Sequence, residues 1–250
     1  MKLFPLYVPT KNRADTSKLL PLLTASKIQA TMVLERKQLE PYQRLHNRHK
    51  VLEIPGDDLG LPFARQLVLD EAEKRGEEWI WMLDDDISGF FRSLGGKNVR
   101  SPPEDVLLAA QATIGPNIGQ VALEYQQYSW SAKAPWKRNS YCDVAVLIRT
   151  GLGQKFDNDV TLKLDRDFTI QTIALGYDTI RCCQLAFAAP KNGSNKGGLF
   201  DEYAASGVER EASRRLALKW PWCVKTNTKQ DGREDAKILW EKIRRGMPPR

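Results

Sequence analysis

The sequence predicts an α/β fold with a mostly parallel sheet flanked by helices, and three observations lead to that prediction. Short apolar runs of strand length alternate with segments of helical spacing along the first 190 residues. The run Trp79-Ile80-Trp81-Met82-Leu83 is apolar throughout, which is typical of a strand buried on both faces. The length of 250 residues and the 42% hydrophobic share suit one large domain or one domain with an appendage.

The individual elements follow from local pattern and from residues that begin or end helices. Apolar and β-branched runs predict strands at 3–8, 30–35, 51–54, 79–83, 120–125, 142–149 and 179–187. Helical spacing predicts helices at 17–24, 63–75, 101–113, 167–175, 207–219 and 233–245. Gly76 and Gly176 follow two of these helices as C-terminal stops. We therefore expect a core over 1–190, then a flexible loop and a basic helical extension, packed on the core, over 191–250.

Three carboxylates, Asp84, Asp85 and Asp86, follow the apolar run without a turn signal. Because Asp is disfavoured inside strands, the chain should leave the sheet here, at the edge where open α/β folds bind ligands. Clustered carboxylates repel one another unless a cation lies between them, and Mg²⁺ is often held by one or two carboxylates plus substrate phosphates. The feature predicts a metal-diphosphate enzyme. A solvated acidic turn is the simpler alternative, and a calcium loop would need an EF-hand glycine and glutamate that are absent.

Composition narrows the class of protein. The N-terminus lacks a signal-peptide apolar region and no apolar stretch reaches membrane-spanning length, so we expect a soluble, cytoplasmic protein. Four cysteines show no CxxC spacing, and the adjacent Cys182 and Cys183 are expected to be buried hydrophobes. His46 and His49 are expected in a solvent-facing loop, which makes a zinc site improbable.

The net charge of +7 is concentrated at the C-terminal end of the chain. Residues 207–250 hold 12 Lys and Arg against 6 Asp and Glu, a net of +6. Such a block suits a polyanion such as nucleic acid. A solvated helix face with extra lysines is an equal alternative on charge alone.

The order of motifs resembles the GT-A glycosyltransferases, especially the inverting family 2 type. Strand one ends in Pro9-Thr10-Lys11-Asn12-Arg13, and Gly60-Leu-Pro-Phe-Ala64-Arg65 opens a helix. Asp84-Asp85-Asp86 and the helix-starting Asp165-Arg166-Asp167 follow in that order. A closer resemblance is to the phage TET-associated glycosyltransferases. Three later motifs carry it: Asn192-Gly-Ser-Asn-Lys-Gly-Gly198, Trp220-Pro221 and Asp235-x-Lys237-x-x-Trp240. Such enzymes transfer a sugar from a nucleotide sugar to 5-hydroxymethylcytosine in DNA, here in a phage-infected bacterial cell.

The resemblance implies a UDP-sugar donor, of glucose or N-acetylglucosamine type, and a divalent metal, Mn²⁺ or Mg²⁺. Asp84 and Asp86 would flank the metal, with Asp85 assisting or pointing toward the sugar. The further donor-binding candidates are Pro9, Thr10, Asn12, Arg13, Glu35, Arg65 and Lys196. The alternatives are a solvated strand end for Glu35, a surface ion pair for Arg65 and a flexible linker around Lys196. Because no histidine follows His49, Asn192, Asn195 or Lys196 would complete the site.

Asp165 and Asp167 are the candidate catalytic bases that the resemblance implies. One carboxylate must take the proton of the acceptor hydroxyl, and a single base opposite the leaving group would invert the anomeric centre by direct displacement. Asp165 takes the place of the second acid in the Glu-Asp pair of the family and is favoured. Leu164 stands where that pair usually begins, so which aspartate acts stays open. An Asp here is also a good helix cap.

The acceptor side is expected to be aromatic and basic. Base stacking and phosphate contacts are expected from Tyr125, Tyr128, Trp130, Trp136, Lys133, Lys137 and Arg138; a hairpin that tucks these aromatics into the core is the alternative. Arg214, Arg215 and Lys219 on the C-terminal helix would bind DNA backbone. Two other functions compete with that of a DNA-modifying sugar transferase. One is a GT-A enzyme with a glycan or lipid-linked acceptor, which the absence of membrane segments and the presence of the basic block disfavour. The other is a non-catalytic nucleic-acid-binding protein, which the acidic motif disfavours.

Overall fold

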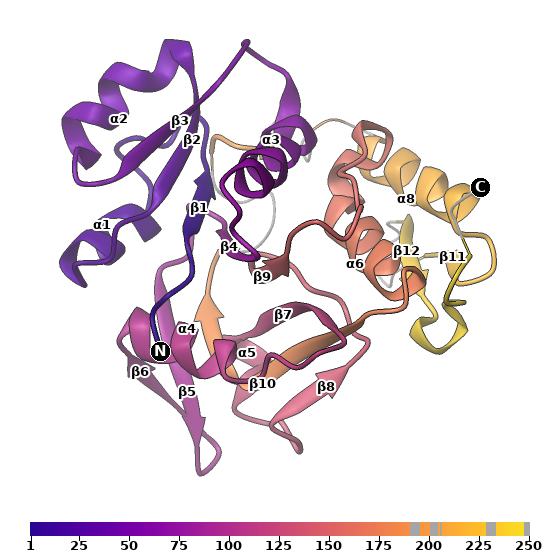
Figure 1. Cartoon of the computed structure of the whole chain (residues 1–250). Helices are drawn as coiled ribbons and strands as arrows, with labels where there is room; N and C mark the ends of the chain where they lie inside the picture. Colours follow the sequence, from indigo (N-terminus) through magenta and orange to yellow (C-terminus); the bar gives the residue numbers. More distant parts are fainter. Residues whose placement is uncertain (191–195, 201–204, 206, 229–233, 248–250) are drawn as a thin grey trace.

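The chain is described here from a computed structural model that covers residues 1–190, 196–200, 205, 207–228 and 234–247. Ten strands form one sheet: β1 Leu6–Pro9, β2 Thr31–Glu35, β3 Lys50–Ile54, β4 Trp79–Leu83, β5 Gly89–Leu94, β6 Lys97–Ser101, β7 Ile118–Tyr125, β8 Trp136–Arg138, β9 Ala145–Arg149 and β10 Asp178–Ala188. Two more, β11 Val224–Thr228 and β12 Glu234–Ile238, form a separate hairpin. Figure 1 shows the arrangement.

The large sheet has the order β3-β2-β1-β4-β9-β7-β10-β5-β6, with β8 pairing with β10. Strands β3, β2, β1 and β4 are parallel neighbours, and β7 is parallel to β10. Strands β9, β5 and β8 run against their neighbours. The other seven strands therefore share one direction, which confirms the prediction of a mostly parallel α/β sheet. The antiparallel β9 in its centre was not foreseen.

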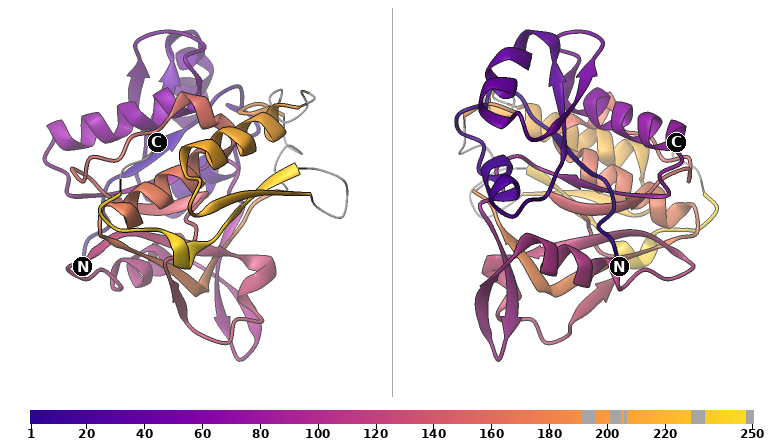
Figure 2. Two further views of the ribbon diagram at one scale, coloured as in Figure 1. Left: turned by 90° about the vertical axis from the view of Figure 1, so that its right-hand side faces the viewer. Right: turned by 60° about the vertical axis from the view of Figure 1, so that its left-hand side comes forward.

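Helices cover both faces of this sheet (Figures 1 and 2). Their bounds are α1 Leu19–Ala25, α2 Leu39–His46, α3 Gly60–Lys74, α4 Pro103–Gln111, α5 Gln126–Ser129, α6 Leu164–Ala174 and α8 Val208–Lys219. Three short 3₁₀ turns are η1 Arg36–Gln38, η2 Asn158–Lys163 and η3 Trp240–Lys242. No helix of the described residues is both long and apolar enough to cross a membrane.

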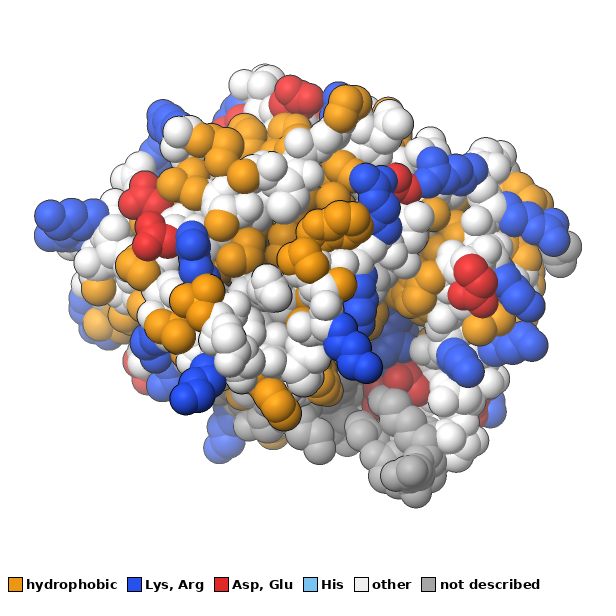
Figure 3. Space-filling model, turned by 90° about the horizontal axis from the view of Figure 1, so that it is seen from below, with side chains coloured by type: hydrophobic (Ala, Val, Ile, Leu, Met, Phe, Trp, Pro, Cys, Tyr) orange, Lys and Arg blue, Asp and Glu red, His pale blue; other side chains and the backbone are white. Residues whose placement is uncertain are grey.

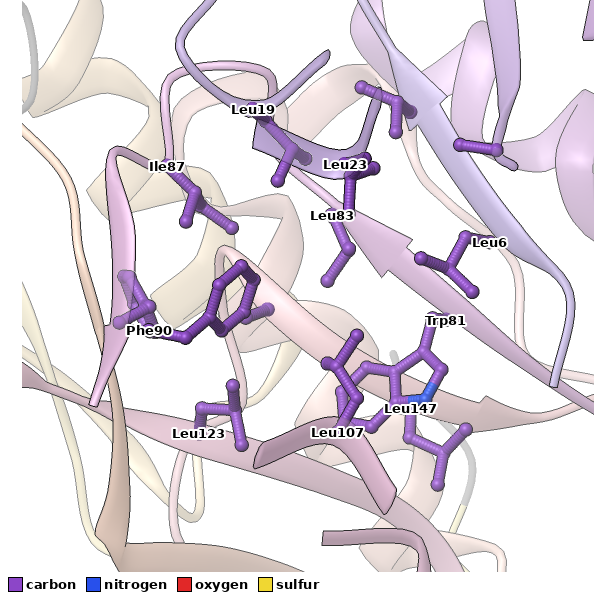
Figure 4. Close-up of a cluster of buried hydrophobic side chains, with 14 of the residues drawn as sticks. Leu6, Leu19, Leu23, Trp81, Leu83, Ile87, Phe90, Leu107, Leu123 and Leu147 are labelled. Carbon is purple, nitrogen blue, oxygen red and sulfur yellow. The ribbon is translucent and has the colours of Figure 1, made fainter. Parts of the chain in front are cut away.

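Strand β4 is buried on both faces, as its continuous apolar run predicts. Trp81 and Leu83 belong to the core that β4 forms with α1 and α4, whereas Ile80 and Met82 pack with α3. Figure 4 shows the first of these cores, in which Trp81 lies near Leu107 of α4. The buried indole of Trp81 donates a hydrogen bond to Gln111 Oε1 (3.0 Å). Packing on both faces fixes where β4 ends in the sheet and so fixes the position of Asp84.

The C-terminal segment packs on the core through a third apolar cluster. Trp220 and Leu216 of the α8 region are fully buried against Ile170 and Ile173 of α6. The helix predicted at 207–219 is confirmed as α8. The helix predicted at 233–245 is wrong, because residues 234–238 pair with β11 as an antiparallel strand, and the described residues after them form the 3₁₀ turn η3.

The prediction that His46 and His49 face solvent is also wrong, because both are buried. His46 ends α2, a helix that the sequence reading missed, and its Nε2 lies 2.6 Å from the Ala14 carbonyl oxygen. His49 Nδ1 accepts the Ala30 amide (3.2 Å), and burial lowers its pKa. Cys182 and Cys183 are buried free thiols, as expected.

Candidate active site

A cavity of about 610 Å³ lies at the edge of the sheet where several strands end. The last residues of β1, β2, β3 and β7, namely Pro9, Glu35, Ile54 and Tyr125, line this cavity, as does Asp84 just beyond β4. In open α/β sheets the carboxyl ends of the strands are where ligands bind. The position therefore makes the cavity the candidate ligand site.

The three consecutive aspartates all line this cavity. The Asp84 amide donates to the Val144 carbonyl (2.9 Å), and the Asp85 carbonyl accepts the amides of Lys18 and Leu19 at the start of α1. These bonds hold the turn after β4 in place. The side chains of Asp84 and Asp86 remain partly exposed, at 34% and 19%, so both can meet a ligand.

Asp85 is the buried member of the three and belongs to a network at the mouth of β1. Its carboxylate accepts hydrogen bonds from Arg13 Nη1 (2.5 Å) and from the Thr10 hydroxyl. Tyr42 of α2 contacts the same Thr10 hydroxyl (2.7 Å) and accepts the Arg13 amide (3.0 Å). Burial raises the pKa of Asp85 even though Arg13 opposes that shift. Asp85 therefore positions Arg13 and Thr10 rather than offering a free oxygen to the cavity.

Arg13 also fastens a distant segment, Lys196–Gly198, over the end of β1. Its guanidinium donates to the carbonyls of Lys196 (2.9 Å) and Gly197 (3.0 Å), and the Gly198 amide donates to Lys11 (3.1 Å). Gly197 has φ +84°, and an added Cβ would lie 2.9 Å from two backbone oxygens, so only glycine fits. Lys196 is thereby placed on the cavity wall. Asn192 and Asn195 lie outside the described residues.

Glu35 is not a solvated strand end, because its side chain is only 5% exposed. It accepts hydrogen bonds from Lys11 Nζ (2.7 Å) and the Asp58 amide (2.9 Å). Burial would raise its pKa, but bonds from Lys11 and Lys37 hold the pKa below its usual value. Asn12 is held by Gln38, whose side-chain oxygen accepts the Asn12 amide (2.6 Å). The mouth of β1 and β2 is thus a preformed polar wall.

Arg65 joins two of the predicted site aspartates and is not a surface ion pair. Its side chain is 4% exposed, with Nη2 2.8 Å from Asp84 and Nη1 in contact with Asp165. Burial raises the pKa of Asp84 to about 7, with Arg65 opposing the shift and Asp86 and Asp165 adding to it. The two sites that the sequence separates by 81 positions therefore share one cation.

Asp165 and Asp167 occupy different environments, although both lie in the first turn of α6. Asp165 lines the cavity and is 32% exposed. Asp167 is fully buried and accepts from Lys219 (2.9 Å), the Trp220 indole (2.7 Å) and Gln171 (2.7 Å). Asp167 therefore anchors the C-terminal segment, and Asp165 is the one that can face an acceptor.

Asp143 is a cavity carboxylate that the sequence reading missed. It comes just before β9, and its Oδ2 accepts a hydrogen bond from the Tyr125 hydroxyl (3.1 Å). Its Oδ1 is buried and accepts no hydrogen bond from any residue that the structure describes. Burial raises its pKa to about 6, with Arg181 opposing and Asp165 adding to the shift.

The cavity wall carries a formal net charge of −3. Its charged residues are four cations, Lys11, Arg13, Arg65 and Lys196, and seven carboxylates, Glu35, Asp58, Asp84, Asp85, Asp86, Asp143 and Asp165. Across the described ranges, no three His, Cys, Asp or Glu side chains are grouped to hold a metal by themselves. Asp84 and Asp86 nevertheless fit a hard cation of the kind that takes one or two carboxylates and completes its shell with phosphate oxygens and water.

Three of the predicted DNA-contacting aromatics, Tyr128, Trp130 and Trp136, are exposed, whereas Tyr125 is half-buried and packs on Phe187. Trp130 and Trp136 are 55% and 48% exposed. They lie beside the exposed Lys133, Lys137 and Arg138 on and around α5 and β8. Figure 3 views the molecule from below, where hydrophobic and basic side chains mix and acidic ones are sparse. The ring of Tyr128 contacts that of Tyr125 (centroids 6.3 Å apart), which links this face to the cavity.

The basic residues predicted on the C-terminal helix are paired within the protein. Arg214 bonds Glu234 through two nitrogens (3.0 Å each), and Arg215 pairs with Glu211 (2.9 Å). Lys219 lies between Asp157 (2.6 Å) and Asp167 (2.9 Å). These carboxylates offset the charge that α8 could present to a polyanion.

The comparison with protein families decides the identity of the fold. A family model described as TET-Associated Glycosyltransferase matches residues 4–198. The chain belongs to this family. The TET-associated glycosyltransferase core thus includes every strand of the large sheet, and the match ends at Gly198, the residue that bonds Lys11.

One solved structure supports a GT-A glycosyltransferase fold. The crystal structure of S. aureus TarS 1–349 has a TM-score of 0.55 at 15% identity, over 87% of this chain and 65% of that one. The crystal structure of A197 from STIV has a TM-score of 0.45 at 11% identity, over 76% of this chain and 87% of that one. The crystal structure of GalNAc-T7 with UDP, GalNAc and Mn²⁺ has a TM-score of 0.44 at 12% identity, over 88% of this chain and 51% of that one. The likeness to TarS, at 15% identity, shows the fold alone. No curated protein matches.

Proposed function

We propose that this glycosyltransferase transfers a hexose from a UDP-sugar to the hydroxyl of 5-hydroxymethylcytosine in DNA, with the help of a divalent metal. The transferred sugar would be of glucose or N-acetylglucosamine type. The observation that carries the proposal is one cavity, at the carboxyl ends of parallel strands, that contains Asp84, Asp86 and Asp165 together. Such an acceptor would place the reaction in the cytoplasm of a phage-infected bacterium.

The charge of the cavity supports the metal. A diphosphate is itself anionic, so a wall with a formal charge of −3 would repel it unless a further cation entered with it. Asp84 and Asp86 would hold a divalent ion, Mn²⁺ or Mg²⁺, which when bound neutralises the diphosphate leaving group. Lys196 lines the same cavity and adds a positive charge, and Arg13 orients the segment that carries it.

The nucleoside would bind at the mouths of β1 and β2. Pro9, Thr10 and Asn12 form one wall there, and Glu35 offers a fixed, ionised carboxylate to the hydroxyl or N–H groups of the nucleoside. The ion pairs of Glu35 hold it in a single orientation, so little ordering is needed on binding.

Asp165 would accept the proton of the attacking hydroxyl. It is a partly exposed carboxylate on the cavity wall, and the ion pair with Arg65 fixes its position relative to Asp84. One base placed opposite the leaving group favours direct displacement with inversion. The burial of Asp167 under α8 favours Asp165 over it.

The acceptor DNA would lie on the exposed surface of Trp130, Lys133, Trp136, Lys137 and Arg138. Aromatic faces stack on bases and cations hold phosphates, and Tyr128 connects this surface to the cavity. Arg138 already pairs with Asp178 (2.6 Å), so Lys133 and Lys137 are the main cations of this surface. Arg214 and Arg215 remain secondary candidates for the same reason, because each is paired with a carboxylate.

A transfer assay tests the proposal. Radiolabelled UDP-glucose and UDP-N-acetylglucosamine are incubated with the protein, Mn²⁺ and duplexes that differ only in carrying cytosine or 5-hydroxymethylcytosine. We expect label only in the hydroxymethylated duplex, and none after a chelator is added. Transfer to a glycan with none to either DNA would replace the proposed acceptor by the alternative, a non-DNA acceptor.

A further inference from the structure

The turn that carries Asp143 has an unusual backbone. Val144 has φ +62°, a region that β-branched residues avoid. The Ala145 amide donates to the Asp143 carbonyl (2.6 Å), two residues back, which closes a tight turn of the strained type. The Asp84 amide donates to the Val144 carbonyl (2.9 Å), so the strained turn is fixed directly to the acidic motif. Strained residues of this kind persist where they fix a functional geometry.

This turn presents a carboxylate with one oxygen hydrogen-bonded and one oxygen without a partner among the described residues. Tyr125 donates to Oδ2, while the buried Oδ1 accepts no hydrogen bond from the described residues. Tyr125 is itself fixed, because its ring packs on Phe187 (centroids 4.7 Å apart) and meets Tyr128 edge-on. A buried acceptor without a donor is costly to folding, and a ligand that donates a hydrogen bond would relieve that cost.

The surroundings select the chemistry of that ligand. Asp143 lies on a wall with a formal charge of −3, so an anionic group would be repelled. We propose that Asp143 and Tyr125 form a subsite for a neutral group with O–H or N–H donors, and that this subsite sets substrate specificity. Two such groups would enter the cavity under the proposed function on which this inference rests. One is a hydroxyl of the transferred sugar, and the other is the exocyclic amino group of the cytosine acceptor.

Two substitutions at Asp143 and one at Tyr125 test this subsite. Asp143→Leu has nearly the same shape and no acceptor, Asp143→Asn keeps one acceptor oxygen, and Tyr125→Phe removes the donor to Oδ2. Asp105→Asn, at an exposed aspartate of α4 outside the cavity, is the control. Affinity for UDP and for UDP-sugar is measured by calorimetry, and the KM for hydroxymethylated DNA by transfer.

We expect Asp143→Leu to weaken one of these substrates by about tenfold to a hundredfold, as the loss of a hydrogen bond to a charged group does. Asp143→Asn should be intermediate, and Asp105→Asn should match the wild type. Weaker UDP-sugar binding with unchanged UDP binding identifies the sugar as the ligand. Unchanged donor binding with a raised KM for DNA identifies the base.

Two outcomes overturn the inference. One is a variant that binds both substrates as the wild type does, and the other is an equal loss of UDP and UDP-sugar affinity, which would mean general damage to the cavity. A melting temperature at or above that of the wild type checks that the Asp143 variants fold. If the wild-type protein transfers no sugar to DNA, the proposed function fails, and the UDP-sugar arm still tests Asp143.

Discussion

Replacing Arg65 by Met removes the cation that bridges Asp84 and Asp165, and its effect can be worked out from their geometry. Methionine keeps the length and apolar character of the stem, so the change is mainly one of charge. Breaking a buried ion pair costs about 3–5 kcal/mol. Both carboxylates are about one-third exposed to the cavity, which moderates the penalty. We therefore expect a loss of about 2–3 kcal/mol, or a melting temperature lower by about 4–12 °C for a chain of this size.

The loss should depend on pH, because Asp84 can escape it by taking up a proton. Its pKa is already raised to about 7 in the folded protein, and losing Arg65 raises it further. A raised carboxyl pKa means that the destabilisation is absent at low pH and grows as pH rises through the folded pKa. We expect Arg65→Met to melt close to the wild type at pH 5 and well below it at pH 8. Mn²⁺ should restore the melting temperature of the variant more than that of the wild type, because the ion replaces the missing charge.

Scanning calorimetry from pH 5 to pH 8, with and without Mn²⁺, makes the measurement. Arg65→Lys is the matched control, because a lysine keeps the charge but cannot bridge both carboxylates at once. An equal loss at pH 5 and pH 8 would refute the electrostatic reasoning and assign Arg65 a packing role against Phe156.

Three further predictions concern other parts of the molecule. Asp86→Asn should lower the transfer rate at least a hundredfold, the order expected when metal stabilisation of the leaving group is lost, and full activity of this variant in excess chelator would contradict the metal site. Exchanging Lys133 and Lys137 for Ala should weaken DNA binding and reduce the slope of log K against log salt concentration by roughly two units. Arg214→Ala should change that slope little. A large change for Arg214→Ala and none for the lysine variant would place the DNA site on α8. His49 has a lowered pKa, so its stabilising effect is complete above about pH 6.5 and is lost as pH falls below that value. His49→Gln should therefore make the free energy of unfolding depend less on pH in the range just below about pH 6.5. An unchanged pH dependence would show that His49 does not titrate there.

Much of the fold could be predicted because local patterns and tertiary burial agree. The apolar run of β4 has one solution, a strand covered on both faces, and the acids after it had to leave the sheet. Helix α8 was also predicted correctly. Its local pattern agrees with its packing, because the buried Leu216 faces α6. The predicted helix at 233–245 failed because β11 supplies a hairpin partner that outweighs local propensity, as strand pairing often does.

The site was predicted in part, and the missing parts depend on strand direction and on contacts remote in sequence. Asp143 escaped notice because the predicted strand at 142–149 included it, whereas β9 begins at Ala145. The antiparallel direction of β9 brings the start of that strand to the edge where β4 ends. The burial of Asp167 could not be read from the sequence, since its partners Lys219 and Trp220 lie more than 50 residues away. The pairing of Arg214 with Glu234 could not be predicted either, because the two residues are 20 positions apart in the sequence.

The most direct test of the central claim is single-turnover transfer to hydroxymethylated DNA by the wild type and by Asp165→Asn, with UDP-sugar affinity measured in parallel. The account predicts that Asp165→Asn lowers the chemical rate at least about a hundredfold, as removal of a general base does, while UDP-sugar affinity is nearly unchanged. Asp167→Asn should instead lower the melting temperature, because it disturbs the buried bonds to Lys219 and Trp220. Wild-type transfer rates in Asp165→Asn, or no transfer to hydroxymethylated DNA by the wild type, would contradict the account.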